Sequence, residues 1–280
     1  MSRPVPSTQP QPPRKSHALR TTLIVIGSVL LLLLIVSITM SIVTALTRTD
    51  ASGSYEVRDS FESVRLEVDA SDIDVSFANV SEPTITFDQT DSNRAVRFEQ
   101  GVRGDELLIL VSSRGGFFPF GFWPWGNGDS STLDLVLPEE LNDGSLSLDL
   151  SSAAGNMTVD GDFADVTVSL TAGNLDLAGS ADVVTLDSTA GDVRVDDFAA
   201  TEVNIDSTAG NVTVELTELP DALEFSSVAG NQQVTLPDGE YRINTDTVAG
   251  DVTIDVPSDP DAARVYSFSS VAGDIRISDR

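Results

Sequence analysis

Apolar and polar residues alternate along most of this chain, and the alternation restarts seven times. Each restart carries Ala-Gly followed by Asn or Asp, and the seven glycines are 18, 18, 19, 20, 20 and 23 residues apart. Self-similarity at such a period predicts a stack of repeated structural units. The glycines are Gly155, Gly173, Gly191, Gly210, Gly230, Gly250 and Gly273.

Within each repeat, apolar residues stand seven and five positions before the glycine and two and four positions after it. Around Gly210 these are Val203, Ile205, Val212 and Val214, and one copy departs from the pattern with Gln232. The alternation slips by one residue at the Gly-Asn/Asp pair, which a straight strand with one buried face does not allow. Glycine accepts a positive φ, and Asn and Asp tolerate turn geometry, so the pair predicts a tight corner. Each repeat is therefore predicted to be a strand, a corner, a strand and a return turn.

One such unit buries too few aliphatic side chains to fold alone, so neighbouring units must stack. The pattern predicts an all-β protein, a parallel β-solenoid with about 18–20 residues per coil over residues 139–280. A β-sandwich is the alternative, because short strands separated by regular turns also suit it. Residues 55–138 contain strand patterns without the Ala-Gly corner, and we expect them to form the N-terminal strands and cap of the solenoid. At the other end we expect the last repeat to form the open edge of the stack, where Asp274, Arg276, Asp279 and Arg280 keep it from pairing with another copy.

The N-terminal part of the chain has a different composition. Residues 1–20 are rich in proline and contain four basic residues and no acid, so we expect a disordered tail. Residues 21–46 carry no charge and are long enough for a transmembrane helix, which we favour over a cleaved signal peptide. Residues 47–54 would be a linker. The positive-inside rule then predicts a single-pass cell-membrane protein with a cytoplasmic N-terminus and residues 51–280 outside the cytoplasm.

An aromatic segment at residues 115–128 interrupts the strand pattern. Its prolines and glycines do not suit a regular strand, so the segment is expected either to plug the solenoid or to contact a partner or the membrane interface. The aromatic residues are Phe117, Phe118, Phe120, Phe122, Trp123 and Trp125.

The net charge and the reactive side chains of the sequence limit the classes of function that are possible. The chain has 44 acidic and 16 basic residues, and every acid lies at Asp50 or later. This charge favours solubility, or attraction of Ca²⁺ or cationic peptides, and its sign excludes nucleic acid as a partner. The one histidine is His17 and there is no cysteine, so residues 51–280 have no His- or Cys-based catalytic site. Paired carboxylates remain possible, but the sequence predicts a protein that is not an enzyme and needs no cofactor.

The residue after each corner glycine is always Asn or Asp. Stacked coils would align these side chains, which then either bond to the backbone of the corner or hold Ca²⁺ between coils. The calcium-binding nonapeptide Gly-Gly-x-Gly-x-Asp is absent, which favours the backbone role.

The repeat Ser/Thr-x-Ala-Gly-Asn/Asp-Val-x-Val, preceded by Leu-Asp-Leu-Val-Leu-Pro at 133–138, resembles a bacterial family of putative adhesins with a β-strand-repeat domain of unknown function. The resemblance covers about residues 60–280. It implies a surface-exposed solenoid on a membrane anchor, and it supplies no catalytic residues. The predicted function is therefore display of an acidic solenoid for adhesion or cell-envelope interaction, with an unknown surface ligand. The alternative is envelope-stress sensing or capture of cationic peptides.

Overall fold

The computed structural model describes residues 52–89, 96–113 and 131–280. The predicted tail at 1–20, the transmembrane helix at 21–46 and the aromatic segment at 115–128 lie outside these residues. Within the described ranges, no helix is both long enough and apolar enough to cross a membrane.

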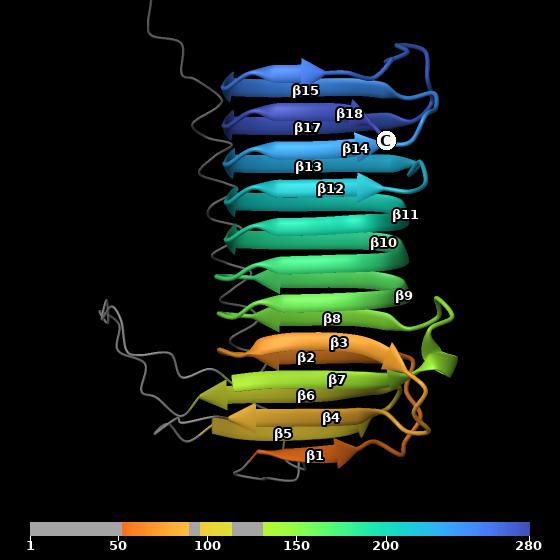
Figure 1. Ribbon diagram of the computed structural model, residues 1–280, viewed down its shortest axis with the longest axis vertical. Helices are drawn as coiled ribbons and strands as arrows, with labels where there is room; N and C mark the ends of the chain where they lie inside the picture. The colour runs from red at the N-terminus through yellow and green to blue at the C-terminus, as the bar shows by residue number, and fades with distance from the viewer. Residues whose placement is uncertain (1–51, 90–95, 114–130) are drawn as a thin grey trace, which may run out of the picture. The chain divides into compact units, whose positions relative to one another are not determined.

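The described part of the chain is all-β, with one short 3-10 helix, η2 (Glu139–Leu141). Its strands join into one long, mostly parallel sheet, the arrangement of a β-solenoid (Figure 1). The strands of the N-terminal region are β1 (Gly53–Glu56), β2 (Ser63–Val68), β3 (Asp72–Ala78), β4 (Thr84–Gln89), β5 (Val96–Arg103), β6 (Glu106–Ser113) and β7 (Ser131–Pro138). The strands of the repeats are β8 (Ser147–Ser152), β9 (Met157–Leu170), β10 (Leu175–Ala190), β11 (Val193–Ala209), β12 (Val212–Leu216), β13 (Ala222–Ala229), β14 (Gln232–Leu236), β15 (Arg242–Ala249), β16 (Val252–Ile254), β17 (Val265–Ala272) and β18 (Ile275–Asp279).

Successive repeats pair in parallel and in register, which rules out the β-sandwich. Val184 of β10 lies between Val166 of β9 and Val203 of β11, so equivalent positions of consecutive repeats stack on each other. Strands β9, β10 and β11 continue through the predicted return turns and bend there from one face of the coil to the other. The prediction of separate return turns was wrong for these three coils, because the ladder between β9 and β10 runs on through the bend and the ladder between β10 and β11 is interrupted there only by a bulge at Asp197 and Phe198.

Alternate side chains point inward and fill the space between the two faces of every coil. The core is continuous from Val57 to Ile277 and is made almost wholly of Val, Leu, Ile and Phe. Near the corners the inward side chains become small, and the stacked serines Ser188, Ser207 and Ser227 are buried there. Small side chains are needed because the two faces converge at the corner.

The N-terminal end of the stack does not follow chain order. Strands β2 and β3 pair with β8 and β9 of the repeats, and β6 and β7 pair on their other side. Strands β4 and β5 then pair antiparallel with β7 and β6, and β1 pairs antiparallel with β4. Thus a later coil, β6–β7, is inserted between an earlier coil and the antiparallel strands at the end.

The C-terminal end departs from chain order in the same way. Strands β17 and β18 lie beside β13 and β14, and β15 and β16 pair on the outer side of β17 and β18 (Figure 1). The expectation that the last repeat forms the open edge was therefore wrong. Asp274 and Arg276 belong to an internal coil, and residues 242–254 form the outermost one.

Candidate functional site

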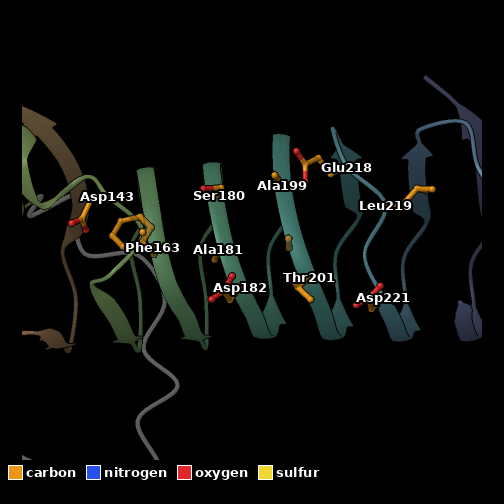
Figure 2. Close-up of a pocket in the computed structure, with 12 residues that line it drawn as sticks. Asp143, Phe163, Ser180, Ala181, Asp182, Ala199, Thr201, Glu218, Leu219 and Asp221 are labelled. Atoms are coloured by element: carbon orange, nitrogen blue, oxygen red, sulfur yellow. The ribbon is translucent and has the colours of Figure 1, made fainter.

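A groove of about 470 Å³ crosses several coils along the edge where the strands bend back. Its walls come from β9, β10 and β11, and its two ends come from the loop before β8 and the loop after β12 (Figure 2). It is lined by Asp143, Gly144, Phe163, Ser180, Ala181, Asp182, Ala199, Ala200, Thr201, Glu218, Leu219 and Asp221.

The groove is hollow because the side chains at its floor are small. Phe163 fills the bend of one coil, whereas the next two coils place Ala181 and Ala200 at the positions that stack with it, and the buried Phe198 of β11 stands two residues before Ala200. The coils approach closely at this edge, and a Cβ on Gly179, whose φ is +112°, would lie 2.0 Å from the carbonyl oxygen of Gly161. The backbone ladder thus fixes the shape of the floor, and the small side chains of Ala181 and Ala200 leave the space above it open.

Carboxylates stand around this floor. Asp143 and Asp182 lie toward one end of the groove, and Glu218 and Asp221 toward the other (Figure 2). The groove-lining residues include no Lys, Arg or His, although Arg264 lies 3.4 Å from an Asp221 oxygen at the rim. The groove therefore suits a ligand that carries positive charge or hydrogen-bond donors.

One rim carboxylate is held in its ionised form. Asp143 accepts hydrogen bonds from the Ser145 hydroxyl at 2.6 Å and from the Ser145 backbone N–H at 3.0 Å. These hydrogen bonds lower the pKa of Asp143 below its usual 3.8. The negative charge at this end of the groove consequently persists in mildly acidic conditions.

Elsewhere the stacking of coils brings like charges together. Asp134 on β7 lies directly beside Asp74 on β3, and Asp88 is close by on β4. Burial, with the added repulsion of these two carboxylates, raises the pKa of Asp134. Asp187 and Asp206 are neighbours on β10 and β11, and burial followed by the Asp206 charge raises the pKa of Asp187. These pairs mark places where ionisation opposes folding.

The seven corner glycines occupy one aligned row, each with a φ between +120° and +147°. A Cβ on any of them would lie 1.7–2.1 Å from a backbone carbonyl oxygen of the neighbouring coil. Both the backbone angle and the lack of space therefore require glycine. The row positions the coils and presents no side chain to a ligand.

The Asn and Asp side chains after these glycines form a continuous ladder. Each backbone N–H donates to the Oδ1 atom of the equivalent residue in the adjacent coil, over distances of 2.7–3.2 Å. Among the described residues, no three acidic, His or Cys side chains are grouped so that they could hold a metal ion. The order of the ladder is Asp72, Asn156, Asn174, Asp192, Asn211, Asn231, Asp274 and Asp251.

Sequence reasoning missed the groove, and the predicted contact residues Phe117, Phe118, Phe120, Phe122, Trp123 and Trp125 lie outside the described residues. The sequence does contain one indication of the groove, because the return segment with Phe163 is followed by one with Ala181 in the next repeat. That difference predicts a hollow only if the two positions stack, and the continuous register of β9 and β10 shows that they do.

These observations define an all-β protein of stacked coils, and the chain belongs to the Toastrack DUF4097 family, which matches residues 63–280. No curated protein matches the chain. Among solved structures, a putative cell adhesion protein from Clostridium sporogenes is 11% identical, with a TM-score of 0.40 over 84% of this chain and 100% of its own. A putative adhesin from Bacteroides fragilis is 12% identical, with a TM-score of 0.43 over 84% and 98% of the two chains.

Proposed function

We propose that this chain is a single-pass membrane protein that displays its stacked coils outside the cytoplasm for adhesion or contact with the cell envelope. The observation that carries the proposal is the groove, a preformed concave surface with small side chains at its floor and carboxylates at its rim. Membership of the Toastrack family supports a role in surface interaction, and two solved structures similar to this chain are named a putative cell adhesion protein and a putative adhesin. The uncharged segment at 21–46 supports the anchor.

The groove suits this role because the shape of its floor does not depend on ordering a loop. Its floor is part of strands that are hydrogen-bonded to both neighbouring coils, so binding does not have to fix a mobile backbone. A rigid surface of this kind loses little conformational entropy on association, which favours contact with an extended ligand. The ligand would place donors toward Asp182 and Glu218.

Membrane topology can be tested with engineered cysteines, because the chain has none. In intact cells a membrane-impermeant maleimide should label a Ser258→Cys variant and should label a Ser7→Cys variant only after lysis. The reverse labelling pattern, or equal labelling of both variants in intact cells, would reject the proposed orientation.

Deletion of the gene is expected to reduce attachment to surfaces or to envelope fragments, and unchanged attachment would count against the adhesive role.

A second candidate function is capture of cationic peptides, favoured by the carboxylates at both ends of the groove. We expect micromolar or tighter binding of a lysine-rich peptide at low salt, weakening as the ionic strength rises. The groove variant Asp182→Asn/Glu218→Gln should bind at least tenfold more weakly. The control Glu215→Gln/Glu224→Gln removes the same charge from residues that do not line the groove. Equal losses in both variants would mean that only the overall charge attracts the peptide.

A further inference from the structure

The last two coils are ordered so that the attachment of one to the stack depends on the other. The outer coil, residues 242–254, pairs through β15 with β17 and through β16 with β18, and these are its strand pairings within the described residues. The final coil, residues 265–279, pairs on both sides, with β13 and β14 toward the body of the stack and with the outer coil. The outer coil, which comes first in the sequence, is thus attached to the stack through the final coil, which follows it in the sequence.

The outer coil is built for the end position. Every other repeat has an apolar residue five positions before its corner glycine, whereas this one has the exposed Thr245. Its other inward-facing residues are poorly covered, and Val252 and Ile254 are 37% and 40% exposed. Such a coil contributes little burial of its own and is held mainly by its backbone pairing to the final coil.

The final coil is fastened to the body of the stack by specific polar contacts. The buried Tyr266 hydroxyl donates to the Pro220 carbonyl oxygen at 2.7 Å, and burial raises its pKa to about 12, so it stays a donor. Gln232, the residue that departs from the apolar pattern, is buried and donates its side-chain N–H to the Ser269 carbonyl oxygen at 2.7 Å. The Tyr266 contact favours the final coil beside β13, because the outer coil has Ile243 at the equivalent position, and the Gln232 contact fastens the coil that lies there.

The chain terminus adds a further fastening. The Arg280 guanidinium pairs with the Asp197 carboxylate, and its Nη1 atom donates to the Leu216 carbonyl oxygen at 3.4 Å. Asp197 lies in the bend of β11, so the last residue of the chain reaches back past β12 to the body of the stack.

We propose that residues 237–280 form a two-coil cap that is latched by the final coil, so that release of the final coil detaches both coils from the stack together. The dependence runs in one direction: release of the final coil releases the outer coil, but the outer coil can leave while the final coil stays. Opening of the cap uncovers the edges of β13 and β14, whose unpaired backbone groups are then able to accept an added strand. The cap is therefore a closing device for the C-terminal end of the sheet.

Hydrogen exchange measured by mass spectrometry on the full chain tests this dependence. Tyr266→Phe keeps the ring and removes the donor to Pro220, so opening of the cap should increase. We expect protection of β17 and β18 to fall about tenfold, with the outer coil never better protected than the final coil. Ile243→Ala in the outer coil should lower protection of β15 and β16 and of the final-coil amides that donate to them, such as the Ile275 N–H that donates to the Asp251 carbonyl oxygen. Protection of the Asp274 N–H, which donates to Asn231 Oδ1 on the other side, should change less than about twofold.

A chain truncated after Val256 provides an independent test that does not rely on the latch residues. It retains the outer coil and lacks the final coil, so residues 242–256 should lose protection while β9 to β12 keep theirs. Arg280→Gln should loosen both coils in the manner of Tyr266→Phe, but more weakly. The proposal is wrong if residues 242–256 stay protected in the truncated chain, or if Ile243→Ala loosens both coils equally.

Discussion

Replacement of one corner glycine should separate two coils. In Gly191→Ala the new Cβ would lie 1.7 Å from the carbonyl oxygen of Gly173 in the adjacent coil. Non-bonded heavy atoms normally stay roughly 3.5 Å apart, so the two coils would have to part by well over about 1 Å at this corner. The φ of +131° is also strained for alanine, which costs about 1–3 kcal/mol.

Separation of the coils weakens the hydrogen bonds between them at that corner. Each contributes about 1 kcal/mol, so three of them and the backbone strain together predict a loss of about 4–6 kcal/mol in the free energy of unfolding. This is a large share of the total stability of a domain, about 5–15 kcal/mol. The three bonds, each 3.0 Å long, run from Gly173 N–H to Ala190 O, from Leu175 N–H to Asp192 O and from Asp192 N–H to Asn174 Oδ1.

Gly144→Ala is the matched control, because it separates backbone strain from steric overlap. Gly144 has a φ of +78°, and a Cβ there would meet nothing within 4 Å. We expect this variant to lose only about 1–2 kcal/mol. Urea unfolding of both variants, followed by circular dichroism, measures the difference. If Gly191→Ala loses no more stability than Gly144→Ala, the close packing of the corners does not contribute as argued.

Three further changes have defined outcomes. Asp134→Asn should raise the melting temperature at pH 7 and leave it unchanged near pH 3. The pKa of Asp134 is raised in the folded protein, so the stability of its protonated form is lost as the pH rises. A gain in melting temperature that persists in acid would contradict this. Asp143→Asn should have the opposite pH dependence, with a small loss at pH 7 that disappears as the pH falls through the lowered pKa, and thermal melts across that range would show it. Asn174→Ala removes the acceptor for the Asp192 N–H and should cost about 1 kcal/mol in urea unfolding, whereas Asn174→Asp keeps the acceptor and should cost less.

The corners could be predicted from the sequence because their chemistry is local. A glycine before Asn or Asp and the slip in alternation together specify a bend within a few residues, and the spacing specifies parallel stacking. The stack of parallel coils is confirmed by the registers of β9, β10 and β11. The backbone role of the Asn and Asp side chains, one of two alternatives, is the one that the ladder at Asn174 and Asp192 displays.

The order of the coils could not be predicted, because the repeats resemble one another enough to occupy the same position. Chain order placed Phe268 at the open end, where an aromatic side chain would be exposed. The structure instead places Thr245 there and buries Phe268 against Phe225, with ring centroids 5.9 Å apart. The polar Thr245 in the penultimate repeat was one indication in the sequence that this repeat lies at the open end. The buried Gln232 was a second indication of the order of the coils, but its partner Ser269 in the final coil is 37 residues away.

The groove depends on the same kind of non-local information. Ala181 and Ala200 are unremarkable in the sequence, and they form a floor only because stacking aligns them next to Phe163. The carboxylates at the rim come from three separate segments of the chain, two of them loops at opposite ends of the groove. Composition predicted an acidic surface but could not distinguish these four side chains from the many others.

The most direct test of the proposed function is attachment of cells that display groove variants at equal surface levels. The test variant neutralises the rim with Asp143→Asn, Asp182→Asn, Glu218→Gln and Asp221→Asn, and the control neutralises Glu139, Glu140, Glu215 and Glu224, none of which lines the groove. If the groove is the contact site, the test variant attaches like the deletion strain and the control attaches like the wild type. Wild-type attachment by the groove variant, with the protein folded and displayed, would contradict the account.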